Sequence, residues 1–430
     1  MISRRRFLEV GGISAALAVA PNAVVPDAAA KSDGDSLPPS LAQLKSRKSE
    51  ATPITREERQ ARQERARQLM HESALDAIVL MEGTSLRYFS GIRWWGGERT
   101  FVLVLPAKGA AFYVCPAFEE GRAREQIANA PGEADVRVWQ EDENPYHLIA
   151  QGLKDRGIAS GKIGLEETVR FVFAEGITKA ASQATIASAT PVTAGCRMSK
   201  SAHEIALMRL ASEVTLAAYE ASYRAVRDGM TQKELEGLVE KAHDRLGFPG
   251  GTDVQVGEFS AFPHGSVTPQ VVHEGTIVLM DGGCTVEGYQ SDITRTFVLG
   301  KASDKMNRVF DIVLRAQTAA LAAARPGVEC GSIDAAARKV VTDGGYGPDY
   351  KYFTHRLGHG LGMEGHEWPY LVRGNPAKLQ ANMTTSNEPG IYIRGEFGVR
   401  IEDDMHITES GAELFTPQTV SLENPFAAGR

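Results

Sequence analysis

The chain has 430 residues, of which 43 % are hydrophobic and 23 % charged, and its 47 basic and 54 acidic side chains give a formal charge of −7. This length favours two domains over a single compact core, and the composition is that of a globular protein, which excludes a disordered, fibrous or membrane-embedded chain. Because there is no excess of basic side chains, we expect no nucleic acid among the partners.

The N-terminal segment has the features of an export signal. Residues 3–8 read Ser-Arg-Arg-Arg-Phe-Leu and precede a mildly apolar stretch over residues 11–25, an order that resembles a twin-arginine signal. Ala28 and Ala30 supply the small side chains of a cleavage site. The apolar stretch is shorter than the roughly 20 residues that span a bilayer, so no membrane insertion is expected. We therefore expect residues 1–30 to be a signal peptide and the mature protein to be periplasmic or secreted.

Two domains are expected after the signal. Residues 31–54 are rich in serine and proline and have few large apolar side chains, which predicts a disordered tether. Short apolar runs and helical stretches follow a capping box at Thr55, which predicts a small α/β domain over residues 55–195. Long helices beginning near Ser201 and Ser303, together with strand pairs, predict an α+β domain over residues 196–430.

Two acidic residues lie on one predicted hairpin of the second domain. An apolar strand over 276–283 contains Asp281, and its expected partner over 288–297 contains Asp292. If residues 286–287 form the turn, Asp281 faces Asp292 on the same side of the sheet, about 5 Å away. Two carboxylates this close favour a bound cation, although either acid alone would be interpreted as a surface turn residue.

A second hairpin repeats this arrangement. Residues 386–393 and 398–404 flank a Gly-Glu-Phe-Gly turn, and the corresponding register places Glu388 opposite Glu402. Arg400 projects from the same face one step earlier, where its guanidinium can bind a substrate carboxylate or backbone. A partner role for Glu396 or Asp403 is the alternative for this arginine.

Four of the ten histidines lie in two glycine-punctuated segments. His355, His359 and His366 occur in the segment 355–367, and His264 occurs in a Phe-Pro-His-Gly sequence. Glycines on both sides of His359 let other backbone approach closely and leave the imidazole unobstructed. A lone histidine is more often structural, but this clustering favours a functional site.

The expected cluster has the ligand chemistry of a two-metal site. Four carboxylates and one imidazole in one pocket carry about four negative charges, which two divalent cations would neutralise. Oxygen-rich ligation with one nitrogen and no thiolate suits manganese or cobalt, and zinc is also possible. Such a site is typical of metal-assisted hydrolysis.

The spacing of these motifs resembles the pita-bread metallopeptidases, the family of aminopeptidase P, prolidase and methionine aminopeptidase. Residues from about 198 to 415 resemble the catalytic domain, with its order Asp, Asp, His, Glu, Glu. Residues from about 60 to 190 resemble the creatinase-like N-terminal domain of prolidase and aminopeptidase P. The resemblance implies an α+β pita-bread domain preceded by a smaller α/β creatinase-like domain.

The resemblance also implies a role for each site residue. Asp281 would bind one metal ion, Asp292 and Glu402 would bridge both ions, and His359 and Glu388 would bind the second. Glu388 would also shuttle protons, while His264 and His366 would donate to the developing oxyanion. His355 would line the proline side of the substrate.

The implied function is an exported Xaa-Pro aminopeptidase, possibly also a dipeptidase, that hydrolyses proline-containing peptides. In dimeric relatives the N-terminal domain approaches the partner subunit's site, so a homodimer is expected and Trp94 is a candidate to cover the proline ring. Two alternatives remain at this stage. One is another amide or phosphoester hydrolase on the same two-metal site, and the other is a non-catalytic metal-binding protein or a metal-free creatinase-like hydrolase.

Overall fold

The computed structural model describes residues 37–94, 96–133 and 135–426. The expected signal peptide, residues 1–30, and the first six residues of the expected tether lie outside these ranges. Within the described residues, no helix is long and apolar enough to cross a membrane.

The segment from Pro38 to residue 54 is structured, so the prediction of a disordered tether is wrong for this part. It contains the short helix α1 (Pro39–Ala42) and the 3-10 turn η1 (Lys48–Glu50), and Leu41 is fully buried. The backbone N–H of Arg47 donates to the carbonyl of Leu246 at 2.8 Å. A segment with so few large apolar side chains cannot form a core, but it can become ordered by docking on helices that are already folded.

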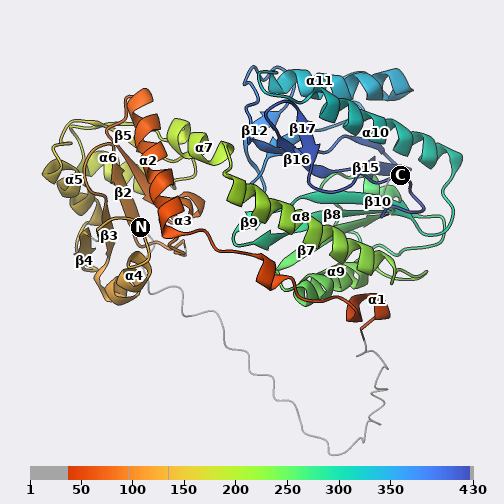
Figure 1. Cartoon of the computed structure of the whole chain (residues 1–430), viewed down its shortest axis with the longest axis horizontal. Coiled ribbons are helices and arrows are strands. Elements are labelled where there is room, and N and C mark those ends of the chain that lie inside the picture. The colour runs from red at the N-terminus through yellow and green to blue at the C-terminus, as the bar shows by residue number, and fades with distance from the viewer. Residues whose placement is uncertain (1–36, 95, 134, 427–430) are drawn as a thin grey trace, which may run out of the picture. The chain divides into compact units, whose positions relative to one another are not determined.

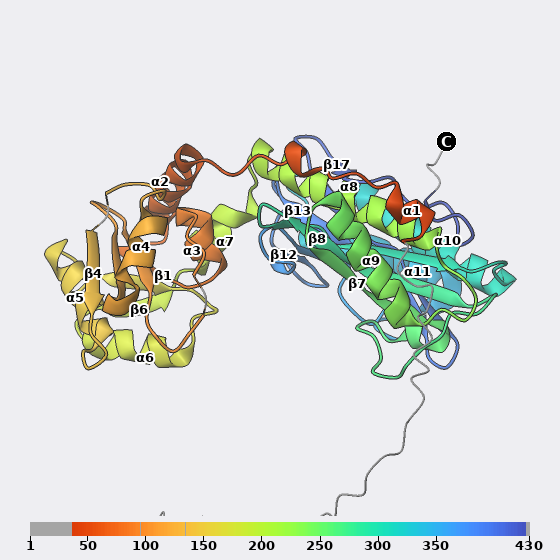
Figure 2. The same cartoon turned by 90° about the horizontal axis from the view of Figure 1, so that it is seen from below.

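The N-terminal half is a mixed six-stranded sheet between two helical layers, as the sequence predicts for an α/β domain (Figures 1 and 2). The strand order is β4-β3-β2-β1-β5-β6. Its strands are β1 (Ala77–Met81), β2 (Val102–Pro106), β3 (Phe112–Pro116), β4 (Asp135–Trp139), β5 (Lys162–Leu165) and β6 (Thr185–Ser188). Its helices are α2 (Arg56–Glu72), α3 (Thr84–Ser90), η2 (Ala117–Glu119), α4 (Glu120–Ile127), α5 (Pro145–Asp155), α6 (Phe171–Ala180) and α7 (Thr190–Met198).

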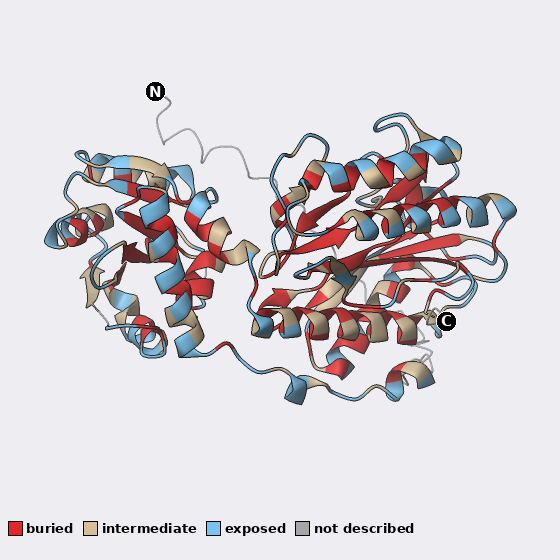
Figure 3. Ribbon diagram, turned by 45° about the horizontal axis from the view of Figure 1, so that its top comes forward, coloured by how far each residue is buried: buried red, intermediate tan, exposed pale blue. Residues whose placement is uncertain are grey.

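Alternating side chains of the central strands form two cores, one on each face of this sheet. Ile78 and Leu80 of β1 pack with residues of α2, α3, α4 and α7, whereas Val79 of the same strand packs with residues of α5 and α6. Successive side chains of a strand point to opposite faces, so a strand buried on both faces is apolar throughout. Figure 3 shows the buried strands of both halves in red.

The second half is an α+β arrangement in which α8 and α9 pack on one group of strands and α10 and α11 on another (Figure 1). The helices are α8 (Ala202–Tyr223), α9 (Gln232–Leu246), η3 (Gly257–Ala261), α10 (Asp304–Ala323), α11 (Cys330–Val341) and the π-turn η4 (Thr342–Tyr346). Capping boxes at Ser201 and Thr231 start α8 and α9, and the helix predicted to begin near Ser201 is confirmed.

The strands of this half form two sheets and a separate ribbon. The first sheet has the order β10-β8-β7, with β9 paired to β8, the second has the order β12-β11-β13-β16-β17, and β14 pairs with β15. The strands are β7 (Gly250–Val256), β8 (Ile277–Val286), β9 (Tyr289–Gln290), β10 (Ile293–Val298), β11 (Gly358–Gly360), β12 (Glu367–Leu371), β13 (Thr384–Asn387), β14 (Gly390–Ile393), β15 (Phe397–Arg400), β16 (Asp403–Ile407) and β17 (Ala412–Leu414).

The register of the first hairpin differs from the prediction. Thr294, and not Asp292, lies opposite Asp281, and the turn is Glu287-Gly288. Both turn residues have positive φ, 50° and 97°, which suits a two-residue hairpin turn of type I′ and makes Gly288 a turn residue. The observed pairing is shifted by two residues from the predicted one, because Thr294 takes the place of Asp292 opposite Asp281. A shift by an even number keeps Asp292 on the same face of the sheet, where it is the diagonal neighbour of Asp281.

The register of the second hairpin is confirmed. Ser386 pairs with Asp404 on one side of the acids, and Gly390 pairs with Arg400 on the other. Glu388 and Glu402 occupy the break between these two ladders, at opposite positions. The break frees both carboxylates from the flat sheet and directs them to the site described below.

Candidate metal centre

A cavity of about 240 Å³ brings nine of the ten predicted site residues together. Its lining is rich in acids and histidines and comes from both hairpins, from the histidine segment and from the loop after η3: Pro263, His264, Asp281, Asp292, His355, Arg356, His359, His366, Glu388, Arg400 and Glu402. Trp94, the tenth residue, is not part of this lining.

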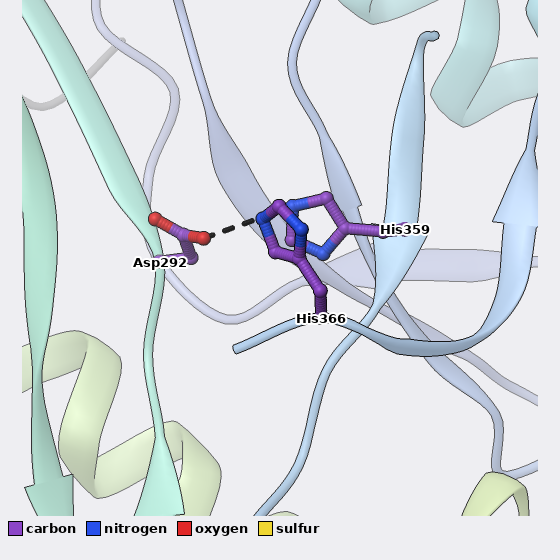
Figure 4. A group of neighbouring side chains, drawn as sticks. All are labelled: Asp292, His359 and His366. Carbon is purple, nitrogen blue, oxygen red and sulfur yellow. Dashed lines mark ion pairs between the residues drawn. The ribbon is translucent and has the colours of Figure 1, made fainter. Parts of the chain in front are cut away.

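The acids and histidines converge in three overlapping groups whose ligand atoms lie within 4.8 Å of one another. Figure 4 shows one of them, in which Asp292 and His366 lie beside His359. The three groups are Asp281, Asp292 and Glu402; His359, Glu388 and Glu402; and Asp292, His359 and His366. The five predicted metal ligands therefore share one location.

His359 presents one ring nitrogen to the acids. Its Nδ1 lies 3.1 Å from the carbonyl of Gly360, which can only accept, so Nδ1 is the protonated nitrogen. Nε2 lies 3.2 Å from Glu388 and 3.8 Å from Asp292. Burial lowers the pKa of His359, but Glu388 and Asp292 more than compensate and raise it above its usual value. The orientation is that of an Nε2 metal ligand whose other nitrogen is held by the backbone.

The acidic cluster has the electrostatics of a cation site. Burial and the charge of Asp281 raise the pKa of Asp292 well above its usual range, and burial and Asp292 do the same for Glu402. The hydroxyl of Thr294 lies 2.7 Å from Asp281 Oδ1 and 2.6 Å from Glu402 Oε2, although it has one proton to donate. Arg400 supplies one positive charge to this cluster of four carboxylates, which leaves an excess of negative charge, so the residues present fit divalent metal ions.

Arg400 is held within the protein. Its guanidinium forms an ion pair with Asp281 and donates to Thr294 Oγ1 at 3.0 Å, to the Pro263 carbonyl at 3.1 Å and to the Tyr392 hydroxyl at 3.1 Å. Only 3 % of its side chain is exposed. These partners occupy most of its donors, which leaves little capacity for the substrate carboxylate that we expected it to bind.

The alternative partners expected for Arg400 are paired elsewhere. Glu396 pairs with Lys305, and Asp403 pairs with Arg295 at 2.7 Å. Arg295 is fully buried and also donates to the carbonyl of Glu402 at 2.8 Å. The sequence reasoning missed this arginine, although Arg295 lies within the strand that follows Asp292.

Two polar side chains that we did not predict orient the ligand candidates. Asp404 accepts from the backbone N–H of Asp292 at 3.1 Å and from Ser212 at 2.8 Å. Ser386 accepts from the backbone N–H of His359 at 3.0 Å and donates to Glu388 Oε1 at 3.0 Å. Such outer contacts fix the positions of ligand side chains.

His355 is a neutral wall of the cavity. Its Nδ1 donates to the Arg356 carbonyl at 2.7 Å, and its Nε2 accepts from the Tyr392 hydroxyl at 2.7 Å. Burial lowers its pKa, in agreement with a neutral ring. With both nitrogens occupied, the exposed part of His355 offers an apolar surface.

His366 and His264 are the two solvent-exposed histidines of the lining. The ring of His366 lies 3.8 Å from that of His359, centre to centre. Desolvation, followed by the neighbouring His359, lowers the pKa of His366 to about 4, so this ring is neutral at pH 7. A neutral imidazole can still donate one hydrogen bond.

A buried ion-pair network lies next to His366. Glu367 accepts from Lys200 Nζ at 2.7 Å and from Arg197 Nε at 3.1 Å, and its side chain is 5 % exposed. Arg197 lies in the last turn of helix α7 of the N-terminal half. The network therefore ties the segment of His366 to that half.

Arg356 is a further lining residue that the sequence reasoning missed. Its guanidinium packs over the ring of Tyr370 at 4.5 Å and lies 3.5 Å from His366 Nδ1. Among the described residues no carboxylate lies within 4.0 Å of it. The adjoining His355 was the only signal in the sequence that could have pointed to it.

Trp94 packs within the N-terminal half. It stacks on Phe101 with ring centres 4.0 Å apart, and the guanidinium of Arg122 lies over it at 4.7 Å. Its predicted place over the site of a partner subunit stays a prediction.

Comparison with known sequences identifies both halves. The profile described as Metallopeptidase family M24 matches residues 206–409, and that described as Creatinase/Prolidase N-terminal domain matches residues 62–199. An Xaa-Pro dipeptidase of Lactobacillus delbrueckii subsp. lactis is 33 % identical over 371 residues, which cover 82 % of this chain and 96 % of the relative.

Solved structures show the same fold. The dipeptidase PepE from Mycobacterium ulcerans superposes with a TM-score of 0.81 at 32 % identity, covering 86 % of this chain and 99 % of the other. The X-Pro aminopeptidase from Thermotoga maritima MSB8 has a TM-score of 0.72 at 31 % identity, with coverage of 84 % and 99 %. The pita-bread fold with a creatinase-like N-terminal domain is thereby confirmed.

Proposed function

Because this chain belongs to metallopeptidase family M24 and is therefore a hydrolase, we propose that it is a two-metal peptidase that hydrolyses the bond before proline in Xaa-Pro dipeptides. The main observation in support of this proposal is that four carboxylates and one imidazole converge in a single cavity. The similarity to an Xaa-Pro dipeptidase over nearly its whole length supports the substrate class.

Five residues would hold the metal ions. Asp281 would hold one ion and His359 the other, and Asp292 and Glu402 would contribute to both, because each of these two acids belongs to two of the three groups. Glu388 completes the set beside His359. When bound, divalent ions supply Lewis-acid polarisation of the scissile carbonyl and lower the pKa of water. The oxygen-rich donor set favours manganese, with cobalt or zinc as alternatives.

The chain's own side chains would carry the proton and the oxyanion contacts. Glu388 lies 3.2 Å from His359 and reaches the cavity, which suits it to accept a proton and return it to the leaving amine. His366 and His264 line the open side of the cavity, where each would donate a hydrogen bond to the developing oxyanion. His355 would pack against the proline ring.

The preference for dipeptides rests on Arg356. A free substrate carboxylate needs a cationic partner, and Arg356 lines the cavity without a carboxylate partner among the described residues. Arg400 has its donors engaged within the protein. We expected Xaa-Pro aminopeptidase activity with some dipeptide cleavage; Arg356 moves the proposal towards dipeptidase activity.

A substrate panel tests this assignment. The proposed enzyme cleaves an Xaa-Pro dipeptide faster than the corresponding dipeptide amide, an Xaa-Pro-Yaa tripeptide or an Xaa-Ala dipeptide, and Arg356→Ala removes the preference for the free carboxylate. Equal or faster cleavage of the tripeptide would make the chain an aminopeptidase. Turnover of phosphoesters without any peptide cleavage would favour the alternative hydrolase on the same site.

Two further features are proposed from the sequence alone. The first is twin-arginine export to the periplasm or the exterior, directed by residues 1–30. Replacing Arg4 and Arg5 by Lys should leave the protein in the cytoplasm, and unchanged export would contradict it. The second is a homodimer in which Trp94 approaches the partner's site, and a monomeric mass by light scattering would contradict it.

A further inference from the structure

A second cavity is lined by arginines. It lies where α2, α3 and the segment after α3 meet the tip of the β8–β9 hairpin, outside the metal centre. Four of its nine lining residues are arginines. The lining consists of Ile54, Arg59, Arg62, Arg87, Gly91, Arg93, Glu287, Tyr289 and Met363. We call it the arginine pocket.

Only one of the four arginines has a close acidic partner. Arg62 pairs with Glu204 at 3.1 Å and donates to the hydroxyl of Tyr289 at 2.7 Å. Within the described parts of the chain, no carboxylate lies within 4.0 Å of Arg59, Arg87 or Arg93. Arg59 and Arg87 are half-buried and Arg93 is exposed, whereas the buried arginines Arg295 and Arg338 each have an acidic partner.

The pocket therefore has an excess of positive charge. Three uncompensated guanidinium groups face one lining carboxylate, that of Glu287, which leaves about two positive charges. Desolvation, followed by the charge of Arg62, lowers the pKa of Arg59, and desolvation followed by Arg93 lowers that of Arg87. Like charges in a confined space favour a bound anion.

Two of the guanidinium groups lie close against glycines. A Cβ at Gly91 would lie 2.7 Å from Arg59 Cζ, and a Cβ at Gly288 would lie 2.5 Å from Arg87 Cζ. Arg87 also donates to the carbonyl of Glu287 at 2.9 Å. The absence of side chains at these glycines leaves room for the two guanidinium groups, and the hydrogen bond to Glu287 holds that of Arg87 in position.

The size of the pocket limits the ligand. Its volume is about 50 Å³, room for roughly three to five water molecules and hence for a single small group. A nucleotide or a peptide chain does not fit within it.

We propose that the arginine pocket binds one doubly charged tetrahedral oxyanion of the phosphate or sulfate class. Such an ion matches the excess of two charges, the volume and the forked geometry of guanidinium donors. The ligand is either free inorganic phosphate or the terminal group of a phosphate monoester. The bound anion joins Arg59 of α2 and Arg87 of α3 to the tip of the β8–β9 hairpin, whose Gly288 lies four residues before Asp292, and so braces the contact between the two halves of the chain.

Titration calorimetry on the metal-loaded full chain tests the proposal, with sulfate as the probe at constant ionic strength. Wild type should bind one sulfate per chain. Arg93→Gln, at an exposed position, and Arg59→Gln should each weaken binding about tenfold, as expected for one lost charged hydrogen-bond partner. Arg65→Gln is the matched control, because Arg65 lies on the same helix but points to solvent near Glu72. The control should bind as wild type does.

The outcomes separate this pocket from other anion sites. Absence of saturable heat in wild type, or unchanged affinity in Arg93→Gln, would overturn the proposal, the latter because the ion would then bind elsewhere, such as at the metal centre. Acetate, which is planar and singly charged, should bind at least about tenfold more weakly, and equal affinity would contradict a tetrahedral dianion. Glycerol phosphate binding as tightly as inorganic phosphate identifies a monoester ligand, and weaker binding identifies the free ion.

Discussion

The guanidinium of Arg400 forms an ion pair with the carboxylate of Asp281 and donates through Nε to Thr294, the residue opposite Asp281 in the β8–β10 ladder. Arg400 and Asp281 both line the cavity, yet the arginine side chain is 3 % exposed. A buried cation in this place offsets part of the negative charge of the cluster and fixes the Asp281 side chain. Arg400 is therefore a positioning residue for a metal ligand.

Replacing Arg400 by Gln should lower metal retention and kcat, because Asp281 loses the contact that orients it. The expected fall in kcat is about tenfold or more, with a much smaller change in KM for an Xaa-Pro dipeptide. Arg356→Gln is the matched control and should show the opposite pattern, a raised KM with metal content unchanged. A raised KM in Arg400→Gln with full metal content would restore Arg400 as the substrate anchor.

His366→Ala should lower kcat by about two to three orders of magnitude while metal content stays unchanged, as expected for the loss of one oxyanion donor. His366 also belongs to a group with Asp292 and His359 that could hold a metal ion, so it could act as a ligand instead of an oxyanion donor. Elemental analysis of the purified variant distinguishes the two roles. Loss of metal together with activity would make His366 a ligand.

Glu367→Gln should destabilise the protein by about 3 kcal/mol, because Lys200 would be left as a buried charge without a counter-charge and Arg197 would keep only Glu364. Urea unfolding measures this difference. Lys179→Gln, which removes the exposed Glu175–Lys179 pair of α6, is the control and should change stability by less than about 0.5 kcal/mol. A similar small effect for Glu367→Gln would show that the network does not hold the two halves together.

Stability should fall on mild acidification because of His243. This histidine is fully buried on α9, with Nδ1 donating to the Val239 carbonyl at 3.0 Å, and burial lowers its pKa to about 4. Between about pH 6.5 and pH 4 the unfolded chain binds a proton that the folded chain does not, so up to about 3 kcal/mol is lost as the pH falls.

The variant His243→Leu keeps the volume and removes the proton site. The difference in unfolding free energy between pH 7 and pH 5 should be smaller in this variant than in wild type. An identical pH dependence in both proteins would mean that other groups cause the acid lability.

The sequence predicted the acidic cluster because hairpin geometry follows from strand and turn residues. For Glu388 and Glu402 the glycine-bounded turn gave the correct register. For Asp281 and Asp292 the turn was placed one residue early, since the value of Gly288 as a positive-φ turn residue was overlooked. Because side chains alternate between the two faces of a strand, Asp281 and Asp292 still lie on the same face of the sheet despite this error in register.

Other features could not be predicted because they depend on contacts between distant segments. Arg400 was expected to face the substrate, but its partners Thr294 and Pro263 lie 106 and 137 residues earlier in the chain. The order of residues 38–54 depends on docking against α9. The arginine pocket joins α2 and α3 to a hairpin tip about 200 residues later in the chain, as the 200-residue separation of Arg87 and Glu287 shows.

Release of free proline from an Xaa-Pro dipeptide, measured against the number of metal ions per chain, tests the central claim most directly. Protein stripped by a chelator should release none, and the rate should rise as manganese is restored up to two ions per chain. Full activity in the stripped protein, or no proline release with two ions bound, would contradict a two-metal Xaa-Pro peptidase.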